Sequence, residues 1–167
     1  MADNATLRVD IARILEADCR LSPEEIARML AVSADIVARE IAEMEASGAI
    51  VRYSARINWD KLDAPERVFA FIGVQATPER EVGFDGIARR LVHFPEVHSL
   101  YLISGGQDFD VVLQGNSMRD IAHFVARRLA VIPGVRSTAT QFVLQTYKSD
   151  GDVLMDAEKP DRLSVTP

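Results

Sequence analysis

The stretch LSPEEIARMLAVSADIVAREIAEMEASGAI, residues 21–50, decides the expected fold of the N-terminal part of the chain. Ser22 can accept a hydrogen bond at the start of a helix, and Pro23 suits the first helical position. Glu25 stands three residues after Ser22 and completes the pattern of a capping box. These signals together predict a helix over residues 23–30.

A second helix is expected after a turn of three residues, Ala31-Val32-Ser33. Ser33 can cap this helix, and Gly48 can end it in the left-handed conformation. The next segment, 49–57, has the pattern of a strand. An apolar stripe at helical spacing indicates one more helix ahead of the capping box. The three helices are therefore expected at residues 6–18, 23–30 and 34–47.

Two short helices joined by a three-residue turn, with a strand after the second helix, are typical of a winged helix-turn-helix. This motif commonly binds DNA, so we expect a DNA-binding domain over residues 1–57. A purely structural bundle of three helices is the alternative. Residues 58–66 are polar around Trp59 and contain Pro65, which predicts a linker after this domain.

The apolar pattern changes after the linker and predicts a second domain over residues 67–148. Its two halves echo each other, because Ala88-Arg89-Arg90-Leu91 returns 38 positions later as Ala126-Arg127-Arg128-Leu129. Each copy has the pattern of a helix end that a proline separates from a strand. Two such halves give the order βαββαβ of a ferredoxin-like domain, and the whole chain is expected to be α+β. The strands are expected at 68–76, 97–103, 108–114 and 135–147, and the helices near 83–93 and after Ser117.

In a βαββαβ domain both helices cover the same face of the sheet. The first expected strand, 68–76, is apolar on both of its faces, so its second face would form an exposed apolar patch. A second copy of the chain is the usual cover for such a face, and we therefore expect a homodimer. The polar segment 149–167 is expected to be a flexible tail.

The charge of the chain is unfavourable for contact with DNA. The net charge is -6 at pH 7 and the pI is near 5.1, whereas phosphate contacts supply much of the affinity of DNA-binding proteins. Within residues 22–47, two arginines oppose six acidic residues. Three of the acidic residues, Glu40, Glu43 and Glu45, either face solvent behind the contact surface or weaken DNA binding.

The sequence has no apolar run long enough to span a membrane, and its start lacks the pattern of a signal peptide. The single cysteine, Cys19, suits a reducing compartment. We therefore expect a cytoplasmic protein with no membrane partner.

Over residues 6–148 the sequence resembles the Lrp/AsnC (feast/famine) family of prokaryotic transcriptional regulators. The resemblance rests on the turn 30–33, the helix exit 45–50, the turn Phe94-Pro95-Glu96-Val97 and the hairpin 104–109. It implies a dimer that is often assembled into tetramers or octamers. It also implies that the αβ domain binds an amino acid or a related small metabolite at a subunit interface.

Carried over by position, the resemblance places the contacts with double-stranded DNA at the start of the second helix of the motif and on the wing. Arg39 could hold a guanine or a phosphate with two hydrogen bonds. The acidic character of this helix departs from the family, whose members usually carry more basic residues there. The expected DNA-contacting residues are Ser33, Ala34, Asp35, Val37, Ala38 and Arg39 on the helix, with Arg52, Tyr53 and Arg56 on the wing side.

The effector site is expected at the glycine-rich hairpin. Gly105 and Gly106 let exposed N–H groups approach a carboxylate, and Asp108 could pair with an amino group. Together these groups would complement an amino acid. Alternatively, the glycines only form a tight turn and Asp108 stabilises that turn. The expected effector-binding residues are Ser104, Gly105, Gly106 and Asp108, with Thr138 and Thr140 as hydroxyl partners from the last strand.

An enzyme is the main rival interpretation. The three histidines, His93, His98 and His123, lack the spacing of metal ligands, and no cysteine and histidine cluster accompanies them. The sequence contains no nucleophile elbow, phosphate loop or nucleotide-binding fingerprint. We therefore expect no catalytic residue, no metal and no cofactor. Two further rivals are a metabolite-binding dimer that has lost DNA binding and a tetrapyrrole-processing relative.

Overall fold

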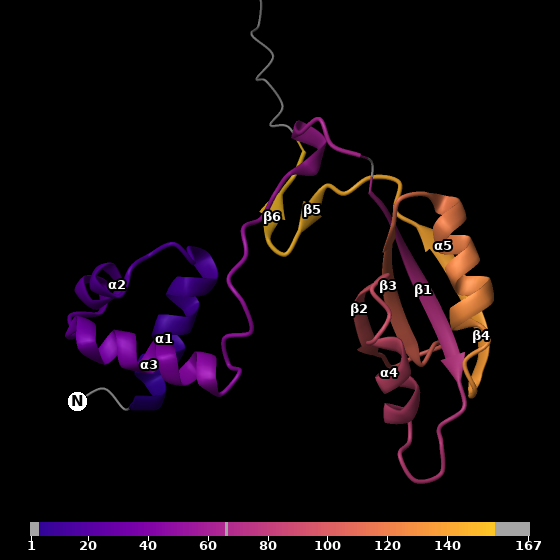
Figure 1. Cartoon of the computed structure of the whole chain (residues 1–167), viewed down its shortest axis with the longest axis horizontal. Coiled ribbons are helices and arrows are strands. Elements are labelled where there is room, and N and C mark those ends of the chain that lie inside the picture. Colours follow the sequence, from indigo (N-terminus) through magenta and orange to yellow (C-terminus); the bar gives the residue numbers. More distant parts are fainter. Residues whose placement is uncertain (1–3, 66, 156–167) are drawn as a thin grey trace, which may run out of the picture. The chain divides into compact units, whose positions relative to one another are not determined.

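The structure is a computed structural model that describes residues 4–65 and 67–155 (Figure 1). The chain divides into two units, Met1–Ile57 and Asn58–Pro167, and each unit is described by itself. The first unit is helical, and the second combines an antiparallel sheet with helices, so the predicted α+β class is confirmed. No helix in the described part of the chain is both long and apolar enough to cross a membrane.

Three helices make up the N-terminal unit: α1 (Asn4–Ala17), α2 (Pro23–Leu30) and α3 (Ala34–Ala46). The capping box at the start of α2 is confirmed. The Ser22 side chain accepts a hydrogen bond from the backbone N–H of Glu25 at 3.3 Å, and the Glu25 carboxylate accepts one from the N–H of Ser22 at 2.8 Å. These two bonds satisfy backbone donors that the first turn of a helix leaves unpaired.

The turn between α2 and α3 relies on a left-handed residue. Ala31 has a φ of 54°, which reverses the chain after α2. Ser33 occupies the position before α3, but its side chain makes no capping hydrogen bond, unlike the prediction. The helices meet in one apolar core, which contains Ile11, Leu15, Ile26, Ala27, Val37 and Met44.

The segment 49–57 does not form the predicted strand. The side chains of residues 51–57 are exposed, and within the described residues this segment pairs with no other strand. A strand is stable only where a neighbouring strand accepts and donates its backbone hydrogen bonds. A short 3-10 helix (η1, Trp59–Lys61) follows this segment, and the prediction of a strand at 49–57 is therefore wrong.

The C-terminal unit has the order βαββαβ and the antiparallel strand arrangement β2-β3-β1-β4. This is the predicted ferredoxin-like fold. Its elements are β1 (Val68–Ala76), α4 (Asp85–Leu91), β2 (Val97–Leu102), β3 (Phe109–Gly115), α5 (Met118–Phe124) with a π-helical continuation η2 (Val125–Leu129), and β4 (Val135–Phe142).

The central strand β1 is buried on alternate residues, so one face of the sheet carries the core. Ile72 and Val74 on this face are fully buried. They share one apolar cluster with Ile87 from α4 and Ile121 from α5. Both helices therefore cover the same face of the sheet.

The opposite face of the sheet has no covering helix in the described part of the unit. Phe71 on β1 is 42% exposed and Tyr101 on β2 is 55% exposed. The strand register places Phe71 opposite Val112 and Tyr101 opposite Asp110, so these side chains share one face. The predicted second apolar face is present on β1, and it is open in a single protomer.

The start of the predicted flexible tail is a small hairpin instead. Strands β5 (Lys148–Ser149) and β6 (Asp152–Val153) pair around Asp150-Gly151, whose φ values are 46° and 95°. Asp-Gly with positive φ at both positions is a favoured two-residue turn. The rest of the predicted tail, 156–167, lies outside the described residues.

This hairpin is attached to the predicted linker. The side-chain amide of Asn58 donates a hydrogen bond to the carbonyl oxygen of Leu154 at 2.8 Å. The guanidinium of Arg67 lies 3.7 Å from the centre of the Trp59 ring, in a cation–π contact. The first residues of the predicted linker are therefore folded as part of the C-terminal unit.

Candidate functional site

Helix α3 carries the helix residues that the sequence predicts to contact DNA. Ser33, Asp35, Ala38 and Arg39 are exposed at or just before its start, and Ala34 is half-buried. Val37 is the exception, because its side chain is fully buried in the core. Val37 packs against its neighbouring helices and has no surface left for DNA, so its prediction as a contact residue is wrong.

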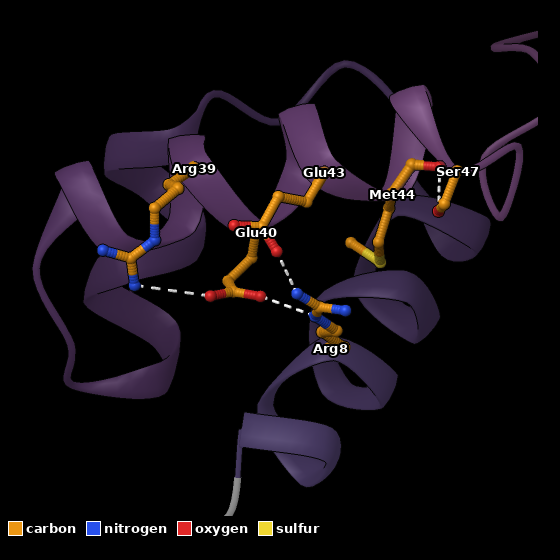
Figure 2. Close-up of polar contacts among 6 residues, drawn as sticks. All are labelled: Arg8, Arg39, Glu40, Glu43, Met44 and Ser47. Atoms are coloured by element: carbon orange, nitrogen blue, oxygen red, sulfur yellow. Dashed lines mark hydrogen bonds and ion pairs between the residues drawn. The ribbon is translucent and has the colours of Figure 1, made fainter.

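Glu40 lies in the interior and not on the solvent face. Its side chain is 1% exposed. The Nε atom of Arg8, on α1, lies 2.6 Å from Glu40 Oε2, and the Nη2 atom of Arg39 lies 3.4 Å from Oε1 (Figure 2). A buried carboxylate is tolerated when cationic donors pair with it. Glu40 is thus neutralised from two sides.

The two other glutamates of α3 also have partners. Glu43 pairs with the guanidinium of Arg8, which lies between Glu40 and Glu43 (Figure 2). Glu45 accepts a hydrogen bond of 2.8 Å from the hydroxyl group of Tyr53. The expectation that all three glutamates merely face solvent is therefore wrong for Glu40. Arg8 and Arg39 thus offset the charge of Glu40 and Glu43, whereas the Glu45 carboxylate is held by a neutral hydroxyl group.

These contacts shift several pKa values. The hydrogen bond from Arg8 lowers the pKa of Glu40 below its ordinary value, against the opposing effect of burial, and Arg39 adds to the lowering. The same bond raises the pKa of Arg8. For Tyr53, which is partly shielded from water, this loss of hydration is the main cause of a raised pKa, and the neighbouring Glu45 raises it further. Glu40 therefore remains ionised to a lower pH than an isolated glutamate.

The remaining predicted DNA contacts lie on the extended segment after α3. Arg52, Tyr53 and Arg56 are exposed there. The bond from Tyr53 to Glu45 ties this segment to α3. The structure thus brings Tyr53 into contact with α3, although the segment has no strand partner in the described residues.

The glycine-rich hairpin connects β2 to β3 and is exposed at Ser104, Gly105 and Gly106. Gly105 has a φ of 127°, which only glycine adopts readily. Asp108 Oδ2 accepts a hydrogen bond of 2.7 Å from the backbone N–H of Ala76 and lies 3.7 Å from a guanidinium nitrogen of Arg136. The Asp108 carboxylate therefore already joins the hairpin to β1 and to the start of β4.

Gln75 is a member of this region that sequence reasoning missed. Its amide nitrogen donates to the carbonyl oxygen of Gly106, and its amide oxygen accepts from the hydroxyl group of Ser137, both at 2.8 Å. Gln75 lies on the open face of the sheet, because residues on alternate positions of β1 are buried. The feature of the sequence that could have identified Gln75 is its place as a polar residue within an otherwise apolar strand.

The two predicted threonines lie on the other face. The register pairs Thr138 with Val74 and Thr140 with Ile72, and both partners are buried beneath the helices. Directly opposite residues of antiparallel strands point to the same face. Within one protomer the structure therefore does not bring Thr138 and Thr140 together with the Gly106 and Gln75 contact.

A separate groove of about 230 Å³ lies along α5 and the start of β2. Its lining includes Glu96, Asp120 and Arg128. One carboxylate oxygen of Glu96 is buried and has no hydrogen-bond partner among the described residues. Sequence reasoning placed Glu96 only in a turn, since nothing in the local pattern indicated that its side chain points inward.

The chain is similar to known transcriptional regulators. A sequence model described as the Lrp/AsnC ligand binding domain matches residues 69–153. The uncharacterized HTH-type transcriptional regulator YugG of Bacillus subtilis is 42% identical over 158 residues, which cover 95% of each chain. The HTH-type transcriptional regulator LrpA of Pyrococcus horikoshii is 30% identical over 138 residues, which cover 83% of this chain and 94% of the relative.

Two solved structures from Mycobacterium tuberculosis share the fold. The leucine response regulatory protein (LrpA) has a TM-score of 0.70 and 27% identity, and the match covers 89% of this chain and 98% of that chain. The feast or famine regulatory protein complexed with L-methionine has a TM-score of 0.69 and 27% identity, with 90% and 98% coverage.

The lowered pKa of Glu40 leads to a prediction about how the thermal stability of the chain depends on pH. A carboxylate whose pKa is lowered by folding stabilises the folded state fully above its unfolded pKa, and this contribution is lost as the pH falls through the folded pKa. We expect the melting temperature of the wild type to exceed that of Glu40→Gln at about pH 7 and the difference to shrink towards about pH 3. Thermal unfolding followed by circular dichroism measures it. A difference that stays constant over this range would contradict the assignment.

Proposed function

Because the chain belongs to the Lrp/AsnC family of helix-turn-helix transcriptional regulators, we propose that it binds double-stranded DNA through α3 and the segment after it. The observation that carries this proposal is the exposed first half of α3, where Arg39 is 61% exposed while Glu40 and Glu43 form ion pairs with Arg8. Arg52 and Arg56 add exposed cationic side chains that can contact phosphates.

The contacts of Glu40, Glu43 and Glu45 reduce the main objection to DNA binding, because Arg8 contributes a positive charge beside two of these carboxylates. Free carboxylates on the contact helix would repel phosphates. Here Arg8 and Tyr53 engage these carboxylates from other parts of the same unit. The acidic composition of α3 is therefore compatible with an attractive surface around Arg39.

DNA binding should show the salt dependence of phosphate contacts. We expect the chain to bind a fragment from upstream of its own gene in fluorescence anisotropy, with an affinity that falls by about tenfold or more between about 50 and about 200 mM salt. No saturable binding at the lower salt concentration would refute the proposal and leave a metabolite-binding protein without DNA recognition.

We further propose that the regulator responds to an amino acid bound at the glycine-rich hairpin. A fold relative with 27% identity is described as complexed with L-methionine, which supports a ligand of this class. The exposed backbone of Gly105 and Gly106 can donate to a carboxylate, and Asp108 can accept from an ammonium group. The exposure of the hairpin suggests that a second copy completes the site.

An amide in place of the Asp108 carboxylate tests this role. Asp108→Asn keeps an oxygen that can accept from the N–H of Ala76 but removes the charge that would pair with an ammonium group. We expect a melting temperature near that of the wild type and an affinity for the effector about 10- to 100-fold weaker. Thermal shift with L-methionine and each of the other standard amino acids measures both. A wild-type shift in the variant would remove Asp108 from the site.

The proposed assembly is a homodimer formed through the open face of the sheet. Phe71 and Tyr101 expose apolar surface there, and burying this surface against a second copy would stabilise the pair. Assembly of dimers into tetramers or octamers is the further proposal. The proposed setting is the cytoplasm, and we propose no enzymatic activity, metal or cofactor.

A charge on the open face should separate the protomers. We expect Phe71→Asp to convert the dimer into a monomer, because a carboxylate would be buried without a partner at the contact. Val131→Asp is the matched control, since Val131 is 65% exposed and lies outside the sheet. Light scattering coupled to size-exclusion chromatography gives the masses. A dimeric Phe71→Asp variant, or a monomeric wild type, would contradict the proposed interface.

A further inference from the structure

Within the described residues, Glu40 is the one charged side chain that is buried. Removing a carboxylate from water costs free energy unless donors replace the lost hydration. Its location also matters, because Glu40 lies on α3 directly after Arg39. The buried charge is thus adjacent to the residue that the proposed function places on DNA.

The two carboxylate oxygens of Glu40 serve different partners. Oε2 pairs with Arg8 at 2.6 Å and so fastens α3 to α1. Oε1 faces the Nη2 atom of Arg39 at 3.4 Å (Figure 2). The Arg8 pair fixes the position of the carboxylate, and the carboxylate then restrains the guanidinium of its neighbour.

Arg39 remains able to bind a ligand while it is held. Its side chain is 61% exposed, and a guanidinium has five N–H donors in a planar fork. One contact with Glu40 leaves donors that can reach a base or a phosphate. A side chain that is already ordered loses less rotamer freedom on binding than a mobile one.

We propose that Glu40 is a positioning residue that holds the Arg39 guanidinium ready for base recognition, with Arg8 fixing Glu40 in turn. This proposal rests on the proposed function and adds to it a source of sequence discrimination. Glu40 itself touches no DNA. Its contribution is the direction of Arg39, so it should act only while Arg39 is present.

The test is a double-mutant cycle on DNA preference. The quantity measured is the ratio of affinities for the upstream fragment of its own gene and for a scrambled fragment of equal length, at about 150 mM salt, where charges beyond about 8 Å are largely screened. A change in net charge alters both affinities by a similar factor and leaves their ratio unchanged. The direction of Arg39 alters mainly the affinity for the upstream fragment, and therefore the ratio. We expect Glu40→Gln to lower the ratio by about two- to tenfold.

In the Arg39→Ala background, Glu40→Gln should have no further effect on the ratio. Glu43→Gln is the matched control, because it removes the same charge from the same helix and contacts Arg8, and no contact joins it to Arg39 in the described structure. We expect its ratio to equal that of the wild type. An unchanged ratio in Glu40→Gln, or an equal further loss in the Arg39→Ala background, overturns the proposal.

A second measurement does not depend on the stability of the Glu40 variant. Nitrogen-15 relaxation of the arginine side chains in the wild-type chain should show the Nε–H group of Arg39 to be more restricted than that of Arg52, which is exposed on the extended segment. Equal mobility of the two overturns the positioning role. A wild type that binds neither fragment overturns the proposed function itself, whereas wild-type binding without preference overturns only the positioning role, which distinguishes the two failures.

Discussion

Strand β1 is buried on one face only, and the arrangement of the C-terminal unit depends on this constraint. Ala70, Ile72 and Val74 are fully buried on the face beneath α4 and α5. Since β1 pairs with both β3 and β4, its alternation fixes which side chains of those strands point to the helices. The same register places Gln75 and the hairpin contact on the open face and the two threonines on the closed one.

The N-terminal unit depends on a different balance. Its apolar core of three helices leaves room for one carboxylate, and that carboxylate is held by arginines from α1 and α3. The ion pair between Arg8 and Glu40 joins α1 to α3 and adds a directional contact to the apolar core. The unit thereby combines an apolar core with a buried ion pair that lies next to Arg39, the proposed DNA contact.

The features that could be predicted from the sequence are mostly local. The capping box at Ser22 and Glu25 uses residues three positions apart, and the fold class follows from patterns within single elements. The Asp150-Gly151 hairpin was also open to prediction, since this dipeptide favours a two-residue turn. The polar composition around this dipeptide instead favours a flexible segment, which is the expectation that the hairpin contradicts.

Features that depend on distant partners could not be predicted in this way. Arg8 and Glu40 are 32 positions apart, and no spacing rule connects them. The segment 49–57 has residues suited to a strand, but a strand also needs a neighbour, and none pairs with it in the described residues. Val37 suits either a core or a contact surface by its place in the motif, and only the packing of the three helices assigns it to the core.

The hydrogen bond between Asn58 and Leu154 brings together the two ends of the described part of the C-terminal unit. A module whose two ends meet can be inserted into another polypeptide with little disturbance on either side. The sheet and helices between these residues could therefore be inserted into an unrelated reporter protein. The output of the reporter would then depend on the ligand that this unit binds. The same closeness favours circular permutation, in which new termini are opened in an exposed loop and the old ones are joined.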